Sequence, residues 1–431
     1  MSLSKLLAIA LISFFSVSVP GQSLSFERDR HKMILSRVKS DLVKNYYDPE
    51  FKKVDVELKY QEAIENIKNA NSVGQMSSSV AQFLAEFDDS HLFYLPPQKA
   101  NTVDYGIDFR MAGDKCLVTH IDKGSDAEKK GLQVGDQLRA ISGLGPTRET
   151  LWKIRYFFYA LFPQPELKLA VIKPDGAAVE YVIVPKISSR PRITRFDINE
   201  AIRESVRDYN NATKQYFHDK LEGVVIWKMP SFSLDPQKVD STINNLRKSP
   251  AILFDLRGNG GGRVDMVLRL IGSLFDKDVK IGDEKTRKGS NEVVAKTIGK
   301  DAYAGKIVVL IDSESASASE VFAKVIQLER RGTVIGERSA GAVMKSRQFG
   351  HQLGDAIVFS FGTSVTIADL VMTDGKSLEK IGVTPDITLT PTPRDLASNR
   401  DPVLSTALRT LGVEVSPESA FEIFAHTLDR P

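Results

Sequence analysis

The chain has 431 residues, of which 42% are hydrophobic and 26% are charged, and its formal net charge is +3. This composition is typical of a globular protein with large cores, and it excludes a disordered chain, a collagen-like chain and a protein with many membrane spans. The near-neutral charge, without a long run of one sign, gives no indication of nucleic acid as a partner. Because Cys116 is the single cysteine, an intrachain disulfide and a cysteine-rich metal site are also excluded.

The N-terminus has the pattern of a secretory signal peptide. Lys5 precedes an apolar run from Leu6 to Val19, and the small residues Gly21 and Ser23 follow it. The run is shorter than the ~20 apolar residues of a membrane-spanning helix, which favours cleavage over an uncleaved anchor or a buried helix. We therefore predict a signal peptide over residues 1–23 and an exported protein, periplasmic or secreted, without an integral membrane segment.

The next two regions differ in the period of their apolar residues. Residues 24–95 have helical spacing, as at Tyr60, Ala63 and Ile67, and a Pro-Pro pair ends this region. From 96 to 187 the pattern changes to short strands such as Cys116–Ile121 and Leu167–Ile172, separated by turn residues. We expect an N-terminal helical region followed by a β domain.

Residues 188–393 alternate strands with amphipathic helices. Val224–Trp227 is a continuous apolar run, Asp235-Pro236 has the pattern of a helix start, and Ile252–Leu256 is the next strand. Strand–helix–strand units of this kind indicate a parallel sheet covered by helices, and hence an α/β core in a multidomain protein. A further helical stretch is expected around 199–208, and residues 394–431 are expected to form a helical tail.

A glycine-rich turn follows the strand at 252–256. Its sequence, Asp255-Leu256-Arg257-Gly258-Asn259-Gly260-Gly261-Gly262, exposes backbone amides beside a helix start. The spacing matches neither nucleotide-binding fingerprint, so phosphate binding is disfavoured. Two interpretations remain: an oxyanion hole, or a tight turn that requires positive φ.

A serine-rich turn, Asp312–Glu320, joins the strand at Ile307–Ile311 to the next helix. A serine on a strand-to-helix turn can present its hydroxyl as a nucleophile. Ser317 and Glu320 also have the spacing of a capping box, in which the hydroxyl only satisfies a helix amide. Spacing alone leaves both interpretations open.

A serine nucleophile needs a general base, and the chain has six histidines that could serve. None of them forms a metal-binding motif. His91 lies in the polar segment Asp88-Asp89-Ser90-His91, at the break between the helical and β regions. A loop histidine can equally be a solvated one. We predict no metal site and no cofactor.

Together these segments resemble the catalytic domain of the tail-specific, or carboxyl-terminal processing, serine proteases. The resemblance rests on Asp255–Gly262, Ser315–Glu320 and Gly336–Gly341, and it spans Asp88–Leu389. The segments Gly124–Ala127 and Gly131–Leu138 resemble the PDZ domain of the same proteases. The resemblance implies a ClpP/crotonase-like core over 188–393, a PDZ-like domain over 96–187, and Ser317 as the nucleophile.

The chain differs from the better-known bacterial members of this family at the position of the catalytic base. Where those members have a catalytic lysine, this chain has Ala342, and the nearest lysine is Lys345. The tricorn-like branch instead uses a histidine in an Asp-x-His segment and a glutamate before Gly-Val-x-Pro-Asp. Both are present here, which implies that His91 is the general base and that Glu379 orients it.

The same resemblance implies the remaining site residues. The oxyanion hole would consist of the Ala318 amide and that of Gly260 or Gly261. In the PDZ-like region, Tyr105-Gly106-Ile107-Asp108-Phe109 stands where such domains receive a peptide's terminal carboxylate, which gives Tyr105, Gly106, Ile107 and Phe109 as peptide-binding residues.

The sequence therefore predicts an exported, metal-independent serine endopeptidase that cuts peptides or unfolded proteins, selected partly by their C-terminal tails. Two alternatives stay open. One is a protease with a displaced Ser317/Lys345 dyad, and the other is a catalytically silent peptide-binding adaptor.

Overall fold

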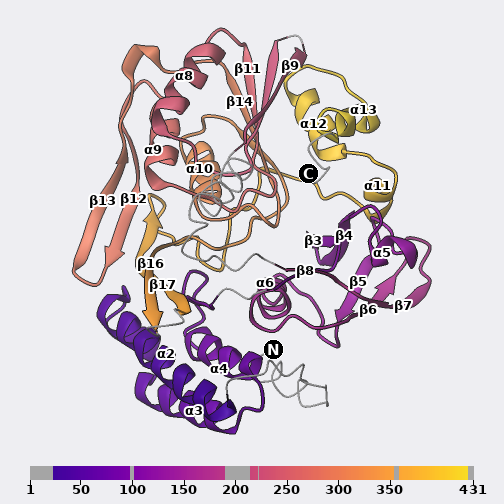
Figure 1. The fold of residues 1–431 in the computed structure, drawn as a ribbon. Helices are drawn as coiled ribbons and strands as arrows, with labels where there is room; N and C mark the ends of the chain where they lie inside the picture. Colours follow the sequence, from indigo (N-terminus) through magenta and orange to yellow (C-terminus); the bar gives the residue numbers. More distant parts are fainter. Residues whose placement is uncertain (1–22, 98–100, 190–213, 222, 354–358, 426–431) are drawn as a thin grey trace, which may run out of the picture.

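The computed structural model describes residues 23–425 apart from 98–100, 190–213, 222 and 354–358 (Figure 1). The apolar run of the predicted signal peptide and the helical stretch predicted around 199–208 lie outside the described residues. Among the helices described, none combines the length and the apolar character that crossing a bilayer requires.

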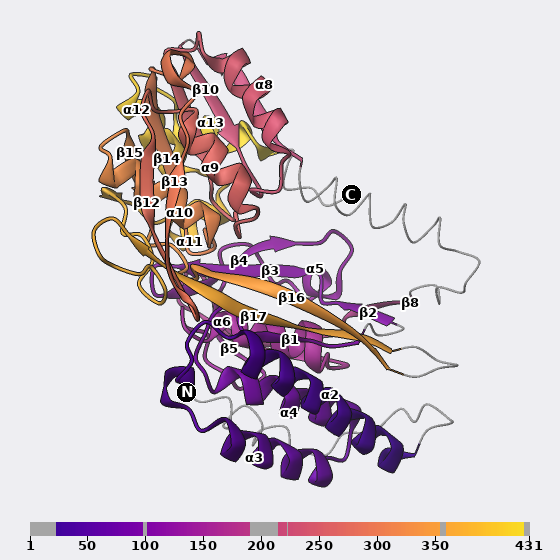
Figure 2. The same cartoon turned by 90° about the vertical axis from the view of Figure 1, so that its left-hand side faces the viewer.

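Three helices open the described chain and pack on one another (Figure 2). They are α2 (Leu24–Asn45), α3 (Val56–Asn69) and α4 (Val73–Ala85), with the short 3-10 turn η1 (Phe51–Lys53) between α2 and α3. Each helix begins at a polar residue, Ser23, Asp55 or Ser72, whose side chain accepts a first-turn amide. Ser23, the last residue of the predicted signal peptide, is thus the N-cap of α2.

The predicted helical region ends in a strand that belongs to an antiparallel sheet. The strands of this sheet are β1 (Phe93–Leu95), β12 (Val279–Thr286), β13 (Gly289–Ala295), β16 (Met344–Leu353) and β17 (Phe359–Met372). β17 pairs with β1, β12 and β16. The segment just after His91 is therefore joined to the C-terminal half of the chain.

The middle region is a five-stranded antiparallel sheet with strands in chain order. Its strands are β3 (Ile107–Ala112), β4 (Lys115–Ile121), β5 (Gln137–Ile141), β6 (Leu167–Ile172) and β7 (Ala178–Ile183). The helices are α5 (Asp126–Lys129) and α6 (Leu151–Arg155), which continues as the π-helix η2 (Tyr156–Leu161), while β2 (Asn101–Asp104) pairs with β8 (Lys186–Ser189). Side chains of this sheet and of the N-terminal helices form one continuous hydrophobic core. β3 is an edge strand of its sheet.

The third region contains the predicted sheet, in the order β18-β15-β14-β11-β10-β9. The strands are β9 (Tyr216–Leu221), β10 (Val224–Lys228), β11 (Ala251–Asp255), β14 (Lys306–Ile311), β15 (Thr333–Gly336) and β18 (Ile387–Thr388). All neighbouring pairs are parallel except β9 with β10.

Helices cover both faces of this sheet, as expected for a mostly parallel sheet. The helices α8 (Pro236–Leu246), α9 (Val264–Gly272) and α10 (Ala318–Leu328) cover one face, and α12 (Pro402–Thr410) and α13 (Pro417–Glu422) cover the other. The short helix α11 (Pro393–Ala397) lies beside Gly135 of the β domain, and the 3-10 turn η3 (Gly299–Asp301) precedes β14. Val309 of β14 packs with α8 to α10, whereas its neighbours Val308 and Leu310 pack with α12 and α13. The predicted helical tail is thus part of the core.

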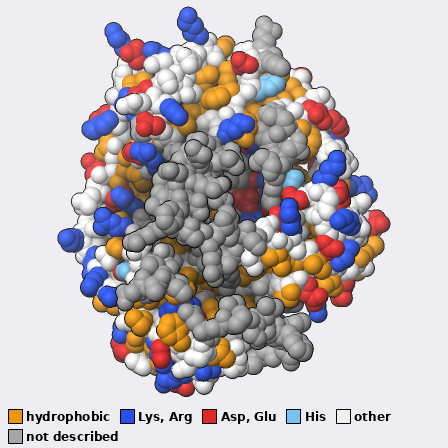
Figure 3. Space-filling model, viewed as in Figure 1, with side chains coloured by type: hydrophobic (Ala, Val, Ile, Leu, Met, Phe, Trp, Pro, Cys, Tyr) orange, Lys and Arg blue, Asp and Glu red, His pale blue; other side chains and the backbone are white. Residues whose placement is uncertain are grey.

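Charges are mixed on the face drawn in Figure 3, where Lys and Arg alternate with Asp and Glu. This distribution agrees with the small net charge of +3.

Candidate active site

The site forms where two turns leave the carboxyl ends of neighbouring strands. The glycine-rich turn follows β11, the serine-rich turn follows β14, and these two strands pair in parallel. In sheets of this kind the carboxyl ends of the strands are the usual location of binding sites.

Ser317 has a backbone conformation that is rare for a residue with a side chain. Its φ is 56° and its ψ is −117°. Such a conformation costs about 1–3 kcal/mol and persists only where surrounding contacts enforce it. The Ser317 amide donates to Ala342 O at 2.9 Å and to Glu320 Oε2 at 3.0 Å, and both contacts hold the turn.

The glycine turn lies directly against the serine turn. The carbonyl oxygen of Asn259 accepts the Ala316 amide at 2.9 Å and the Ser319 hydroxyl at 2.8 Å. A Cβ on Gly261 would lie 2.7 Å from Ser317 Cβ, and φ at this glycine is +102°. Glycine is therefore required at 261 for two turns to approach so closely.

The two turns carry the backbone amides that the resemblance implied for the oxyanion hole. Ala318 begins α10, and the first amides of a helix have no intrahelical acceptor. The Gly261 amide donates to Asn259 Oδ1 at 2.9 Å. This bond argues against Gly261 as a donor, which leaves Gly260 as the candidate of the two glycines.

His91 lies between α4 and β1, with its backbone fixed at both ends. Its amide donates to Asp89 Oδ1 at 3.0 Å, and its carbonyl accepts the Ser364 hydroxyl at 2.8 Å. Burial lowers the pKa of the imidazole below its usual range, against the opposing effect of Asp89. The imidazole is therefore neutral at pH 7, as a general base must be.

Glu379 reaches the imidazole through Ser90. Its carboxylate accepts the Ser90 amide at 3.0 Å and the Ser90 hydroxyl at 2.8 Å, while the same hydroxyl oxygen lies 2.7 Å from His91 Nδ1. The resemblance implied that Glu379 orients the imidazole, and in the structure the Ser90 hydroxyl lies between these two groups. Ser90, to which the sequence motif assigned no role, therefore belongs to the same hydrogen-bonded group as His91 and Glu379.

These contacts fix the imidazole tautomer. Because the Ser90 hydroxyl donates its proton to Glu379, its oxygen is left to accept a proton from Nδ1. The other ring nitrogen, Nε2, then carries the lone pair that can accept a proton. Burial raises the pKa of the Glu379 carboxyl above its usual range, against the hydrogen bonds from Ser90 and Val343.

Two consecutive residues tie the serine turn to this chain of hydrogen bonds. Ala342 O accepts the Ser317 amide at 2.9 Å, and the Val343 amide donates to Glu379 Oε2 at 3.0 Å. Hydrogen bonds of this loop thereby connect the turn that carries Ser317 to Glu379, which is linked to His91 through Ser90.

Glu320 is a second residue whose role the motifs did not reveal. Its carboxylate is fully buried and accepts the amides of Ser317, Gly341 and Ala342 and the hydroxyl of Ser339. Burial raises its pKa to about 7, against these hydrogen bonds. The capping-box glutamate thus holds the serine turn and the 339–342 loop together.

Lys345, the alternative base, is engaged elsewhere. It lies on β16, and its ammonium contacts both oxygens of Glu284 on β12, at 2.8 and 2.9 Å. This ion pair holds the Lys345 ammonium at β12, which argues against the displaced dyad. In the described part of the chain, no cluster of three or more His, Cys, Asp or Glu side chains could hold a metal ion.

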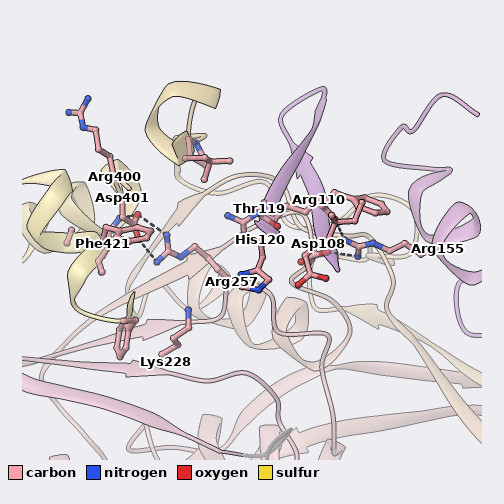
Figure 4. A pocket seen from close by; sticks show the side chains of 18 of the residues that line it. Asp108, Arg110, Thr119, His120, Arg155, Lys228, Arg257, Arg400, Asp401 and Phe421 are labelled. Atoms are coloured by element: carbon pink, nitrogen blue, oxygen red, sulfur yellow. Dashed lines mark hydrogen bonds and ion pairs between the residues drawn. The ribbon is translucent and has the colours of Figure 1, made fainter. Parts of the chain in front are cut away.

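The expected peptide-binding segment lies beside a cavity of about 720 Å³, and Ile107 and Phe109 line it (Figure 4). Two of the expected residues serve other contacts. The Gly106 amide donates to Asp104 Oδ1 at 2.9 Å, and the buried Tyr105 hydroxyl donates to Gln164 O at 2.9 Å. Neither group is therefore placed to receive a terminal carboxylate.

The α/β fold and the serine-bearing turn at the carboxyl end of β14 indicate a peptidase of the serine class, and comparisons with known proteins agree. Residues 223–389 match the family model described as peptidase family S41. The tail-specific protease of Haemophilus influenzae is 27% identical over 388 residues, which is 84% of this chain and 52% of that protein. The carboxy-terminal processing protease CtpA of Bacillus subtilis is 22% identical over 326 residues, 72% of this chain and 63% of that protein.

The solved structures show the same fold. The crystal structure of mature CPAF has a TM-score of 0.65 at 16% identity, and the match covers 86% of this chain and 94% of that one. Residues 223–389 thus match peptidase family S41, and over most of its length the chain is similar to tail-specific, or carboxyl-terminal processing, proteases.

Proposed function

We propose that the chain is a serine endopeptidase in which Ser317, His91, Ser90 and Glu379 carry out peptide-bond hydrolysis. The observation that carries the proposal is the loop at Ala342 and Val343, which bonds Ser317 on one side and Glu379 on the other. A half-buried imidazole linked to a carboxylate, and through a loop to a strained serine, supports the assignment of a nucleophile and its base.

The reaction follows from the proton positions. His91 Nε2 takes the Ser317 hydroxyl proton as the oxygen attacks the peptide carbonyl. The amides of Ala318 and Gly260 stabilise the negative charge that develops on the carbonyl oxygen. His91 then protonates the leaving amine, and the acyl-enzyme at Ser317 is hydrolysed by water activated by the same imidazole.

Labelling with a fluorophosphonate tests this proposal. We expect the wild-type protein to form a covalent adduct at Ser317 and to cleave unfolded protein, and Ser317→Ala to do neither. A wild-type protein that neither reacts nor cleaves would instead be the silent adaptor. Absence of a catalytic lysine at Ala342 motivates this second candidate.

A pair of variants distinguishes the two possible bases. His91→Ala is expected to lose activity by a factor of at least ~10². Lys345→Met should retain activity and lose at most about 1 kcal/mol of the free energy of unfolding, because its ion pair with Glu284 is partly exposed. The reverse result would favour the displaced dyad.

The β domain over 96–187 is proposed to be a PDZ-like domain and the core to be ClpP/crotonase-like. In support, β3 is an edge strand that an extended peptide could join, and Ile107 and Phe109 line the adjacent cavity. Substrates would then be peptides or unfolded proteins selected by their C-terminal tails. Comparing kcat/KM for one peptide with a free and an amidated C-terminus tests this selection, and equal values would contradict it.

Export is proposed on the apolar run from Leu6 to Val19. The expected mature protein is periplasmic or secreted and begins near Ser23, the N-cap of α2. Cell fractionation with N-terminal sequencing tests this expectation, and a cytoplasmic protein that keeps residues 1–22 would contradict it.

A further inference from the structure

The C-terminal helices meet the glycine turn at the wall of the cavity that Figure 4 shows. Arg257 and Asp401 contact each other in this wall, and the aromatic residue Phe421 lies beside them. Arg257 directly precedes Gly258, so its side chain anchors the segment that carries the oxyanion-hole candidate Gly260.

Two carboxylates hold the Arg257 guanidinium. Asp255 accepts from Nε at 2.9 Å and from Nη2 at 2.8 Å. Asp401 accepts from Nη1 at 2.9 Å and lies 2.8 Å from Nη2. The planar guanidinium is therefore fixed on two edges, which restricts it far more than a single carboxylate would.

Asp401 is itself fixed by the fold. It is the N-cap of α12, where its Oδ1 accepts the Leu404 amide at 2.9 Å. Its own amide donates to Pro417 O at 2.8 Å, which connects it to α13. Because α12 packs on the parallel sheet, the position of Asp401 is set by the core and not by the glycine turn.

We infer that Asp401 is a positioning residue of the active site, which aligns the Gly258–Gly262 turn by holding Arg257. The inference rests on the proposed function, since it concerns the oxyanion hole of the proposed peptidase. It assigns a catalytic consequence to the C-terminal helices, which lie outside the matched family segment at residues 223–389.

The competing view is that Asp255 suffices. Asp255 is fully buried, and Arg257 and Lys228 outweigh the effect of burial and hold its pKa below its usual range. If this pair alone orients the turn, Asp401 only caps α12 and its loss changes stability without a specific effect on the reaction.

Asp401→Asn separates these views, because asparagine is an equally good N-cap but cannot pair with arginine as a carboxylate does. Asp235→Asn is the matched control, since Asp235-Pro236 begins α8 with the same kind of cap. We expect kcat of Asp401→Asn to fall roughly tenfold with KM changed less than twofold. Affinity for a peptide trifluoromethyl ketone, whose adduct carries an oxyanion, should fall by the same factor. The control should keep wild-type values of both.

A double-mutant cycle with Arg257→Lys completes the test. If Asp401 acts through Arg257, Asp401→Asn should add little to the loss in Arg257→Lys. Wild-type kcat and analogue affinity in Asp401→Asn, a loss confined to KM, or fully additive losses would overturn the inference. If Asp401→Asn does not fold, the kcat of Arg257→Lys is the deciding measurement. A wild-type kcat in Arg257→Lys would overturn the inference. A wild-type protein without Ser317-dependent hydrolysis would instead refute the proposed function, whatever the variants do.

Discussion

Ser90 and Glu379 are joined by two hydrogen bonds, from the Ser90 amide at 3.0 Å and from its hydroxyl at 2.8 Å, although 289 positions separate them in the sequence. The same hydroxyl oxygen lies 2.7 Å from His91 Nδ1. The carboxylate thus acts on the imidazole through a hydroxyl group, and replacing this group is the sharpest test of the arrangement.

Ser90→Ala removes the acceptor for Nδ1 and leaves the imidazole without a fixed tautomer. We expect kcat/KM to fall by a factor on the order of ten to a hundred, which is part of the ~10²–10⁴ that a general base contributes. Ser90→Thr, which keeps the hydroxyl, should retain more activity. Ser79→Ala is the matched control, because the Ser79 hydroxyl bonds only Gln75 O within α4. Unchanged kcat/KM in Ser90→Ala would contradict the role of the hydroxyl.

The pH dependence of catalysis should reflect the half-buried imidazole of His91. Because burial lowers the pKa of His91, the acid limb of kcat/KM is expected to lie below pH 6.5. A lowered pKa in the folded state also means that the stability from this group is present above pH 6.5 and is lost as pH falls through the folded-state pKa. A pH–rate profile and an NMR titration of the imidazole measure this pKa, and a midpoint at or above 6.5 would contradict the prediction.

The contribution of Glu320 to stability should depend on pH in the direction opposite to that of His91. Its pKa is raised to about 7 in the folded state, so its contribution is present below pH 4.5 and is lost as pH rises through about 7. Denaturation by urea at a series of pH values should show this loss in the wild type and not in Glu320→Gln.

The same variant tests the structural role of the carboxylate. Glutamine turns one acceptor into a donor that faces backbone amides, and we expect a loss of about 2 kcal/mol in the free energy of unfolding. Slower labelling of Ser317 by a fluorophosphonate should accompany the loss. Wild-type stability at pH 8 would show that these amides are satisfied in another way.

Gly261→Ala tests the close approach of the two turns. Its Cβ would lie 2.7 Å from Ser317 Cβ and 2.9 Å from Ala316 O, so the turns must separate and activity should fall roughly a hundredfold. Gly350→Ala is the control, because a Cβ there has open space. Comparable kcat/KM in both variants would exclude a tight contact at Gly261.

The sequence was sufficient for the elements that form the parallel sheet. Val224–Trp227 is a continuous apolar run, Ile252–Leu256 is apolar except for Asp255, and Asp235-Pro236 marks a helix start, so pattern and cap agree with the observed β10, β11 and α8. Such elements are predictable because the residues that favour the local secondary structure are also the residues that the fold buries.

The antiparallel sheet around β17 was not predicted. Its strands β12 and β16 carry many polar residues, so their apolar alternation is weak, and their pairing depends on contacts distant in sequence. The roles of Ser90 and Glu320 were not predicted for the same reason. Each role depends on hydrogen-bond partners that are distant in sequence and that only the fold brings close. The occupied amides of Gly106 and Gly261 could not be foreseen either, because a motif records a residue's type and not its hydrogen-bond partner.

The pairing of β1 with β17 has a consequence for when the protein becomes active. His91 immediately precedes the segment that β17 holds, whereas Ser317 and Glu379 belong to the later half of the chain. In the proposed mechanism, a polypeptide in which this pairing has not yet formed has the nucleophile without its proton acceptor. Proteolytic capacity would then arise only after β1 has paired with β17.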